Sequence, residues 1–91
     1  MLIEDIHPKV VEAIKSTIMT MLSDYEITRI DVEAREDSTG DDAIFVDVYR
    51  RPSEIPFDAK KSLDMRAEVW DRVYKLGDKR FPYIFYHHVN E

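Results

Sequence analysis

The sequence EITRIDVEAREDSTGDDAIFVDVYRR, from Glu26 to Arg51, determines the fold because it holds two alternating segments around one polar run. In residues 29–35 and again in residues 44–49, apolar side chains occupy every second position, which is the pattern of a strand with one buried face. These positions are Ile30, Val32 and Ala34, then Ile44, Val46 and Val48. Residues 36–42 between them are polar and include Gly40, which suits a backbone with positive φ. The stretch predicts a β-hairpin whose apolar face the remaining chain must cover.

The length and composition indicate one small domain spanning residues 1–91. Hydrophobic residues make up 44% of the chain and aromatic residues 11%, which is enough for a packed core and argues against disorder. The chain has no cysteine, so disulfides and thiolate metal sites are excluded. No apolar run reaches the ~20 residues that cross a bilayer, and residues 1–5 lack the pattern of a signal peptide. We expect a cytoplasmic protein with no membrane contact.

Charge is distributed unevenly along the chain. Residues 1–49 hold 12 acidic and 4 basic side chains, which gives −8, whereas residues 50–91 hold 7 acidic and 9 basic ones, which gives +2. The total of −6 opposes nucleic-acid binding, because Lys and Arg contacts to phosphates provide most of that affinity. Only the second half of the chain has the charge for a basic patch. The simpler interpretation is a solvated surface that keeps the protein in solution.

Two amphipathic helices flank the hairpin. The first is expected from Pro8, which suits the first turn of a helix, to about Ser23. Its apolar face would consist of Val10, Val11, Ile14, Ile18, Met21 and Leu22. The second is expected to begin after Asp58, a candidate N-cap, and to end at about Leu76, before Gly77. Its expected core-facing stripe is Ala59, Leu63, Ala67, Trp70, Val73 and Tyr74, widened by Val69 and Leu76.

A linker and a third strand complete the expected fold. Pro52 and Pro56 favour an extended course for residues 50–57. After a return at residues 78–82, the aromatic run 83–89 is typical of a strand. Strand, helix and strand in succession imply a right-handed crossover, so the third strand should run parallel to the second. The predicted fold is α+β: a single two-layer domain of α-β-β-α-β order, with a three-stranded mixed sheet and both helices on one face.

Two helices can cover only one face of this sheet, and the alternation leaves aromatic and charged side chains on the other. The third strand would bury either Ile84 and Tyr86 or Tyr83 and Phe85, and the sequence leaves both arrangements open. We interpret the uncovered face as a surface for a protein partner or for homodimerisation. The alternative is that its rings only pair across strands and stiffen the sheet. The candidate contact residues are Phe45, Tyr49, Tyr83 and Phe85, with Arg29, Arg35 and Arg50 as a polar rim.

The sequence offers little for catalysis or for cofactor binding. His87 and His88 are adjacent in an expected strand, so their rings point to opposite faces and cannot easily share a metal ion. His7 precedes the first helix with no second ligand at a suitable spacing. With Gly40 and Gly77 as its only glycines, the chain has no Gly-rich phosphate loop. No serine lies beside a histidine. We therefore expect no enzyme activity, no catalytic residue, no metal and no cofactor.

Two basic pairs, Arg50–Arg51 and Lys79–Arg80, flank the sheet near aromatic residues. Such a mixture can hold single-stranded nucleic acid by stacking and phosphate contacts. In addition, the segments ITRIDV (27–32) and AIFVDVY (43–49) resemble the hairpin of the KH-like bacterial ribosome-binding factor A family, and the α-β-β-α-β order is similar. The likeness covers residues 27–49, and the GxxG motif of KH domains does not accompany it.

The resemblance implies RNA binding on the small ribosomal subunit, and the two basic pairs are the candidate residues for that function. The residues themselves favour a different one. They indicate a small non-enzymatic interaction or accessory protein that binds a protein partner, or a second copy of itself, through the aromatic face of its sheet. RNA binding is the alternative.

Overall fold

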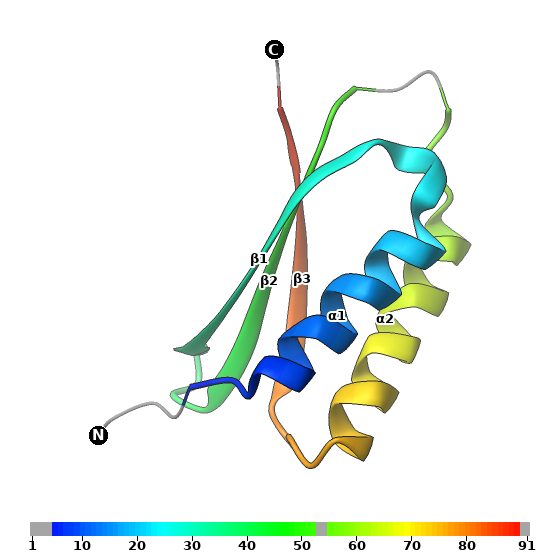
Figure 1. The fold of residues 1–91 in the computed structure, drawn as a ribbon. Helices are drawn as coiled ribbons and strands as arrows, with labels where there is room; N and C mark the ends of the chain where they lie inside the picture. The colour runs from blue at the N-terminus through cyan, green and yellow to red at the C-terminus, as the bar shows by residue number, and fades with distance from the viewer. Residues whose placement is uncertain (1–4, 53–54, 90–91) are drawn as a thin grey trace.

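The computed structural model describes residues 5–52 and 55–89 and confirms the α+β fold with its α-β-β-α-β order. Its helices are α1 (Pro8–Met21) and α2 (Ala59–Lys75), with a short 3₁₀ helix, η1 (Ser23–Tyr25), after α1. Its strands are β1 (Ile27–Glu36), β2 (Asp42–Arg50) and β3 (Phe81–His88). Figure 1 shows the strands as one layer, with α1 and α2 side by side on a single face of it.

Strand β2 lies at the centre of a mixed sheet of order β1-β2-β3. It pairs antiparallel with β1, where Val46 lies opposite Val32, and parallel with β3, where Val46 lies opposite Ile84. A parallel pair needs a long crossover connection, and the segment that contains α2 provides it. The even-numbered side chains of β2 point to the helices, and Val46 has an exposed fraction of 0%. The middle strand thus packs against the helices at the centre of the core.

Residues 37–41 form the β1–β2 turn that the polar run predicts. The Asp37 carboxylate accepts hydrogen bonds from the backbone N–H groups of Thr39 and Asp41, at 2.9 and 3.0 Å. Gly40 has a φ of 86°, a left-handed conformation that glycine adopts at little cost. The side chain of Asp37 and the freedom of Gly40 together fix the turn, and the turn fixes the register of the hairpin.

Helix α1 begins where the sequence predicts and ends slightly earlier. His7 is the N-cap, and its Nδ1 accepts a hydrogen bond from the backbone N–H of Lys9 at 3.1 Å, with Pro8 in the first turn. The helix ends at Met21 and not at Ser23, because the tighter η1 follows. The buried side chains on and just after α1 are Val10, Ile14, Thr17, Ile18 and Leu22.

Both ends of α2 follow the predicted capping. The Asp58 carboxylate accepts hydrogen bonds from two backbone N–H groups of the first turn, at 2.9 and 3.2 Å. At the other end Gly77 has a φ of 94° and donates its N–H to the carbonyl of Tyr74 at 3.0 Å. The N–H of Asp78 donates to the carbonyl of Val73 at 3.2 Å. This pair of bonds is a Schellman motif, which stops the helix and turns the chain toward β3.

The predicted core stripe of α2 is wrong for most of its length. Of its members only Val69 and Val73 are buried, whereas Leu63 is 66% exposed. The buried stripe runs through Ser62, Met65, Val69 and Val73. Both stripes have helical spacing, so periodicity alone does not distinguish them. The helix buries Ser62 because its hydroxyl lies 2.6 Å from that of Tyr86, which satisfies both groups. Four other apolar residues form an exposed outer stripe of α2: Leu63, Ala67, Trp70 and Tyr74.

Strand β3 begins at Phe81, two residues before the predicted start at 83, and includes Pro82. It buries Ile84, which is 4% exposed, and packs Tyr86 against the core. The opposite face of the strand carries Phe85, which stays largely exposed, and Tyr83. Of the two arrangements that the sequence leaves open, β3 therefore adopts the one that buries Ile84 and Tyr86.

The linker expected at residues 50–57 begins one residue late, since β2 includes Arg50. Residues 53–54 of this linker, like residues 1–4 at the amino terminus, lie outside the described residues. Among the helices of residues 5–52 and 55–89, none is both long and apolar enough to cross a membrane.

The buried stripe of α2 gives a direct stability prediction. Replacing Met65 by Ala should lower the free energy of unfolding by about 2–5 kcal/mol, because the side chain is fully buried and leaves a cavity. Leu76→Ala removes a side chain that the sequence assigned to the core but that is 48% exposed, and it should cost about 1 kcal/mol or less. Urea unfolding of both variants measures the difference. Equal losses would contradict the observed stripe.

Candidate interaction surface

The face of the sheet opposite the helices carries side chains from all three strands, and we call it the open face. Odd-numbered residues of the strands occupy this face, and the even-numbered residues face the core. The register arranges most of them in three rows across the sheet: Glu33–Phe45–Tyr83, Asp31–Asp47–Phe85 and Arg29–Tyr49–His87. The charged residues come from β1, with Asp47 of β2 in addition, and the aromatic rings come from β2 and β3.

Phe45 occupies the centre of the open face. Its ring stacks on Tyr83 with 5.3 Å between the centroids, and it lies 6.0 Å from Phe85 with the planes only 7° apart. The Arg35 guanidinium lies over the Phe45 ring, 4.2 Å from its centroid. Aromatic pairs of this kind contribute roughly 0.5–1.5 kcal/mol each. The cluster pairs rings across β2 and β3, and it leaves Phe85 44% exposed.

A second cluster lies at the other end of the open face. Tyr49 stacks on His87 with 4.8 Å between the centroids, and the Arg29 guanidinium lies 4.2 Å from the Tyr49 centroid. The Nε2 of His87 and the Oδ1 of Asp47 are 2.7 Å apart. Arg29 also pairs with Asp31 at 3.2 Å. Each ring of this cluster therefore contacts a charged neighbour, Tyr49 through Arg29 and His87 through Asp47.

The open face is connected to the hairpin turn through Tyr83. Its hydroxyl donates a hydrogen bond to the Asp37 carboxylate at 3.1 Å. This bond raises the pKa of Tyr83, and burial adds to the effect. The hydroxyl of Thr39, which donates to the same carboxylate, lowers the pKa of Asp37. A side-chain hydrogen bond therefore links the turn to the start of β3.

Arg50 does not belong to the rim of the open face, contrary to the prediction. It is the last residue of β2, has an even number, and is 7% exposed on the helix side. Its guanidinium lies over the rings of Tyr25 and Phe57, at 5.3 and 5.2 Å from their centroids. The prediction failed because Arg50 was placed in a linker, where strand alternation does not apply. In the structure it packs the end of the sheet against the connection to α2.

The four basic residues considered for RNA binding do not form one surface. Strands β2 and β3 are parallel, so Arg50–Arg51 at the end of β2 and Lys79–Arg80 before β3 lie at opposite ends of the sheet. Their separation is roughly 25 Å, given the ~3.3 Å rise per strand residue. Arg80 moreover forms an ion pair with Asp78 at 2.6 Å, with side chains only 15% and 11% exposed.

The aromatic cluster extends beyond the predicted residues, around the start of β3 to α2. Trp70 and Phe81 meet edge to face with centroids 4.4 Å apart, and Phe81 lies 4.7 Å from Tyr83. Both Trp70 and Phe81 are exposed. Trp70 was not predicted for this cluster because the sequence pattern had placed it in the core stripe. Helical spacing fits both stripes of α2, so the sequence holds no local signal that identifies this contact.

The described residues offer no metal centre. No group of three or more His, Asp or Glu side chains within residues 5–52 and 55–89 is arranged to hold an ion. A cleft of about 520 Å³ lies between the start of α1 and the α2–β3 connection. Among its lining residues Asp78 and Arg80 neutralise each other, and the hydrogen bond from Arg80 is what lowers the pKa of Asp78. We find no nucleophile paired with a base in this cleft.

The chain matches no family model, no curated protein and no solved structure. A functional interpretation therefore rests on the geometry of the described residues. That geometry presents one feature with the properties of a contact surface, namely exposed rings in ordered clusters bordered by charge.

The Asp78–Arg80 pair predicts how stability depends on pH. The folded-state pKa of Asp78 lies below its ordinary value of 3.8, so the pair stabilises the fold above that pH and is lost as the pH falls through the folded pKa. Asp78→Asn should therefore lower the free energy of unfolding at pH 7 and flatten its decline below about pH 4. Urea titrations across this range measure both effects. Asp64→Asn, in an exposed pair with Lys60, is the control and should change little.

Proposed function

We propose that this protein is a small non-enzymatic interaction module that binds a protein partner through its open face, and that it does so in the cytoplasm. One observation carries the proposal: Phe85 is 44% exposed although it lies 6.0 Å from the Phe45 ring in an ordered stack. An exposed ring of this kind offers apolar surface to a partner without the cost of ordering it first.

The charges around these rings support the same function. Arg35 pairs with Glu33 at 2.9 Å and Arg29 with Asp31 at 3.2 Å, so β1 presents paired charges of both signs beside the aromatic strands. A protein surface with an apolar centre and a mixed polar border complements this arrangement. A polyanion does not, because Asp31, Glu33 and Asp47 would face its phosphates. We do not extend the proposal to RNA, since its basic candidates lie at opposite ends of the sheet.

The central ring of the face provides the test. Phe45→Thr removes the central ring of the stack but keeps a residue that favours strands. It should reduce the amount of captured partner at least roughly tenfold, because aromatic residues at the centre of an interface contribute most of the binding free energy. The measurement is affinity capture from a lysate of the source cells by tagged protein, with quantitative mass spectrometry.

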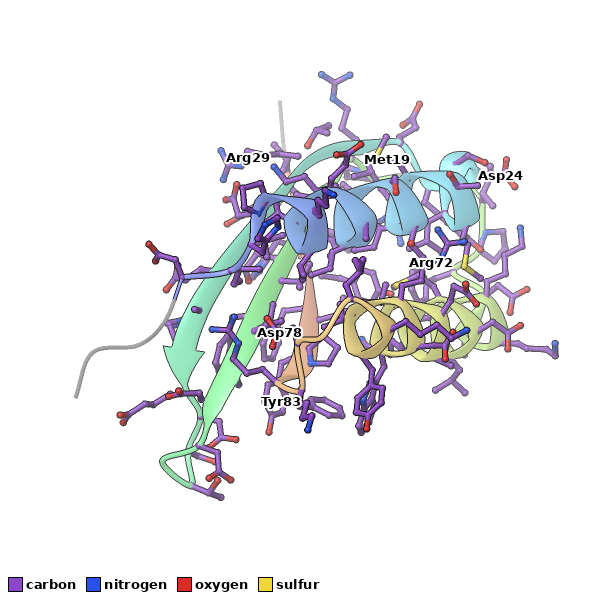
Figure 2. All side chains as sticks on the ribbon, turned by 60° about the horizontal axis from the view of Figure 1, so that its bottom comes forward. Met19, Asp24, Arg29, Arg72, Asp78 and Tyr83 are labelled. Atoms are coloured by element: carbon purple, nitrogen blue, oxygen red, sulfur yellow. The ribbon has the colours of Figure 1, made fainter. Side chains whose placement is uncertain are left out.

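Met19→Gln is the matched control for this experiment. Met19 is 46% exposed and lies on the side of α1 away from α2, as Figure 2 shows. Circular dichroism of both variants is the check that they are folded. The same proteins captured in equal amount by the original chain, the control and Phe45→Thr would contradict the proposal.

A further inference from the structure

Strand β3 has an unpaired outer edge. The N–H of Val89 donates to the carbonyl of Arg50 at 2.8 Å, so the odd-numbered residues of β3 direct their backbone groups toward β2. Backbone groups alternate along a strand, and those of the even-numbered residues point away from β2. These residues are Pro82, Ile84, Tyr86 and His88. Pro82 sits where its missing N–H has no consequence, which is the usual place of proline in an edge strand. No described strand lies beyond this edge.

The two edges of the sheet differ in how they resist further pairing. Edge strands that stay single usually carry charged residues. Strand β1 does so at five of its ten positions: Arg29, Asp31, Glu33, Arg35 and Glu36. Strand β3, with the sequence FPYIFYHH, has no Asp, Glu, Lys or Arg. The β3 edge therefore lacks the protection that the β1 edge has.

The outer stripe of α2 continues this unprotected edge. Arg72 lies on the side of α2 that faces α1, as Figure 2 shows, whereas Trp70 contacts Phe81 at the start of β3. The stripe thus lies on the flank away from α1, with Leu63 66% and Tyr74 57% exposed. Two lysines of the helix form ion pairs within it, Lys60–Asp64 at 3.3 Å and Lys75–Asp71 at 2.9 Å. Between the stripe and β3, the Arg66 guanidinium lies over the Tyr86 ring, 5.4 Å from its centroid. The β3 edge and this stripe form one apolar border of the molecule.

We propose that this border binds a second copy of the same chain. Two β3 strands pair antiparallel about a two-fold axis and form a six-stranded sheet, and the outer stripes of the two α2 helices pack across the axis. The proposal uses the border and not the open face, so it does not rest on the proposed partner binding.

Charge favours a second copy as the occupant. The chain carries a net charge of −6, so two copies repel each other over most of their surface. A two-fold contact also places a surface patch against the same patch of the second copy, which penalises any patch of one sign. The border limits both penalties, because β3 has no Asp, Glu, Lys or Arg and the cation that lies against it, Arg66, rests on the Tyr86 ring.

The outward backbone groups are self-complementary in one register. With Tyr86 on the axis, Ile84 lies opposite His88 of the second copy, and all three residues can exchange both backbone hydrogen bonds. Pro82 remains outside the paired segment. On the open face Phe85 then lies opposite His87 of the second copy, so the dimer joins two open faces into one continuous surface.

Light scattering coupled to gel filtration tests the association. We expect a mass of twice 10.8 kDa at micromolar concentration for the original chain. Leu63→Glu should raise the dissociation constant at least roughly tenfold, because it brings two like charges together at the axis. Met19→Glu, an equal change at an exposed apolar residue of α1, should stay dimeric. A monomeric original chain, or a Leu63→Glu variant that dimerises as tightly as Met19→Glu, would overturn the proposal.

Disulfide formation tests the register in a chain that has no cysteine of its own. Phe85→Cys and His87→Cys are prepared separately and oxidised as a mixture. Opposite residues of a non-hydrogen-bonded pair have Cα atoms ~4.5 Å apart, which a disulfide spans. The mixed disulfide should therefore form in preference to either homodimeric one. Formation of all three in statistical proportion would show that the copies meet elsewhere, whatever the outcome of the partner-capture experiment.

Discussion

The parallel pairing of β2 with β3 is the constraint on which the other features of this molecule depend. Parallel neighbours cannot be joined by a tight turn, so the chain must cross over, and the crossover places α2 on the face that α1 already covers. Both helices are then on one side. The odd-numbered side chains of all three strands remain uncovered, and β3 becomes an edge. The two surfaces for which we propose binding both follow from this topology.

Much of the fold could be predicted because its signals are local. Strand alternation, the turn at Gly40 and the caps at Asp58 and Gly77 each depend on a few neighbouring residues, and the element order then implies the crossover. The core stripe of α2 is different, because two sets of residues share the helical period. The buried stripe packs into the core and its Ser62 hydroxyl meets that of Tyr86, a contact that spans 24 positions along the chain.

For the candidate surface too, features that depend on neighbouring residues could be predicted, and features that depend on contacts between distant residues could not. Phe45, Tyr49 and Phe85 lie on one face as alternation within each strand requires. The sequence placed Arg50 in the linker, whereas β2 extends one residue further and includes it. The face of the sheet on which Arg50 lies depends on where β2 ends. Trp70 was misplaced because its neighbour Phe81 belongs to another element. Contacts between elements far apart in the sequence therefore set the limits of what the sequence alone predicts.

Residue-resolved hydrogen exchange of the backbone amides tests the central claim that β2 is bonded on both sides while β3 has one free edge. The Leu63→Glu variant is suited to it, because it isolates the single chain. We expect slow exchange at every residue of β2 and an alternating pattern in β3, slow at Phe85 and His87 and fast at Tyr86 and His88. Uniform protection along β3 in this variant, or edge-like exchange in β2, would contradict the topology and both proposals built on it.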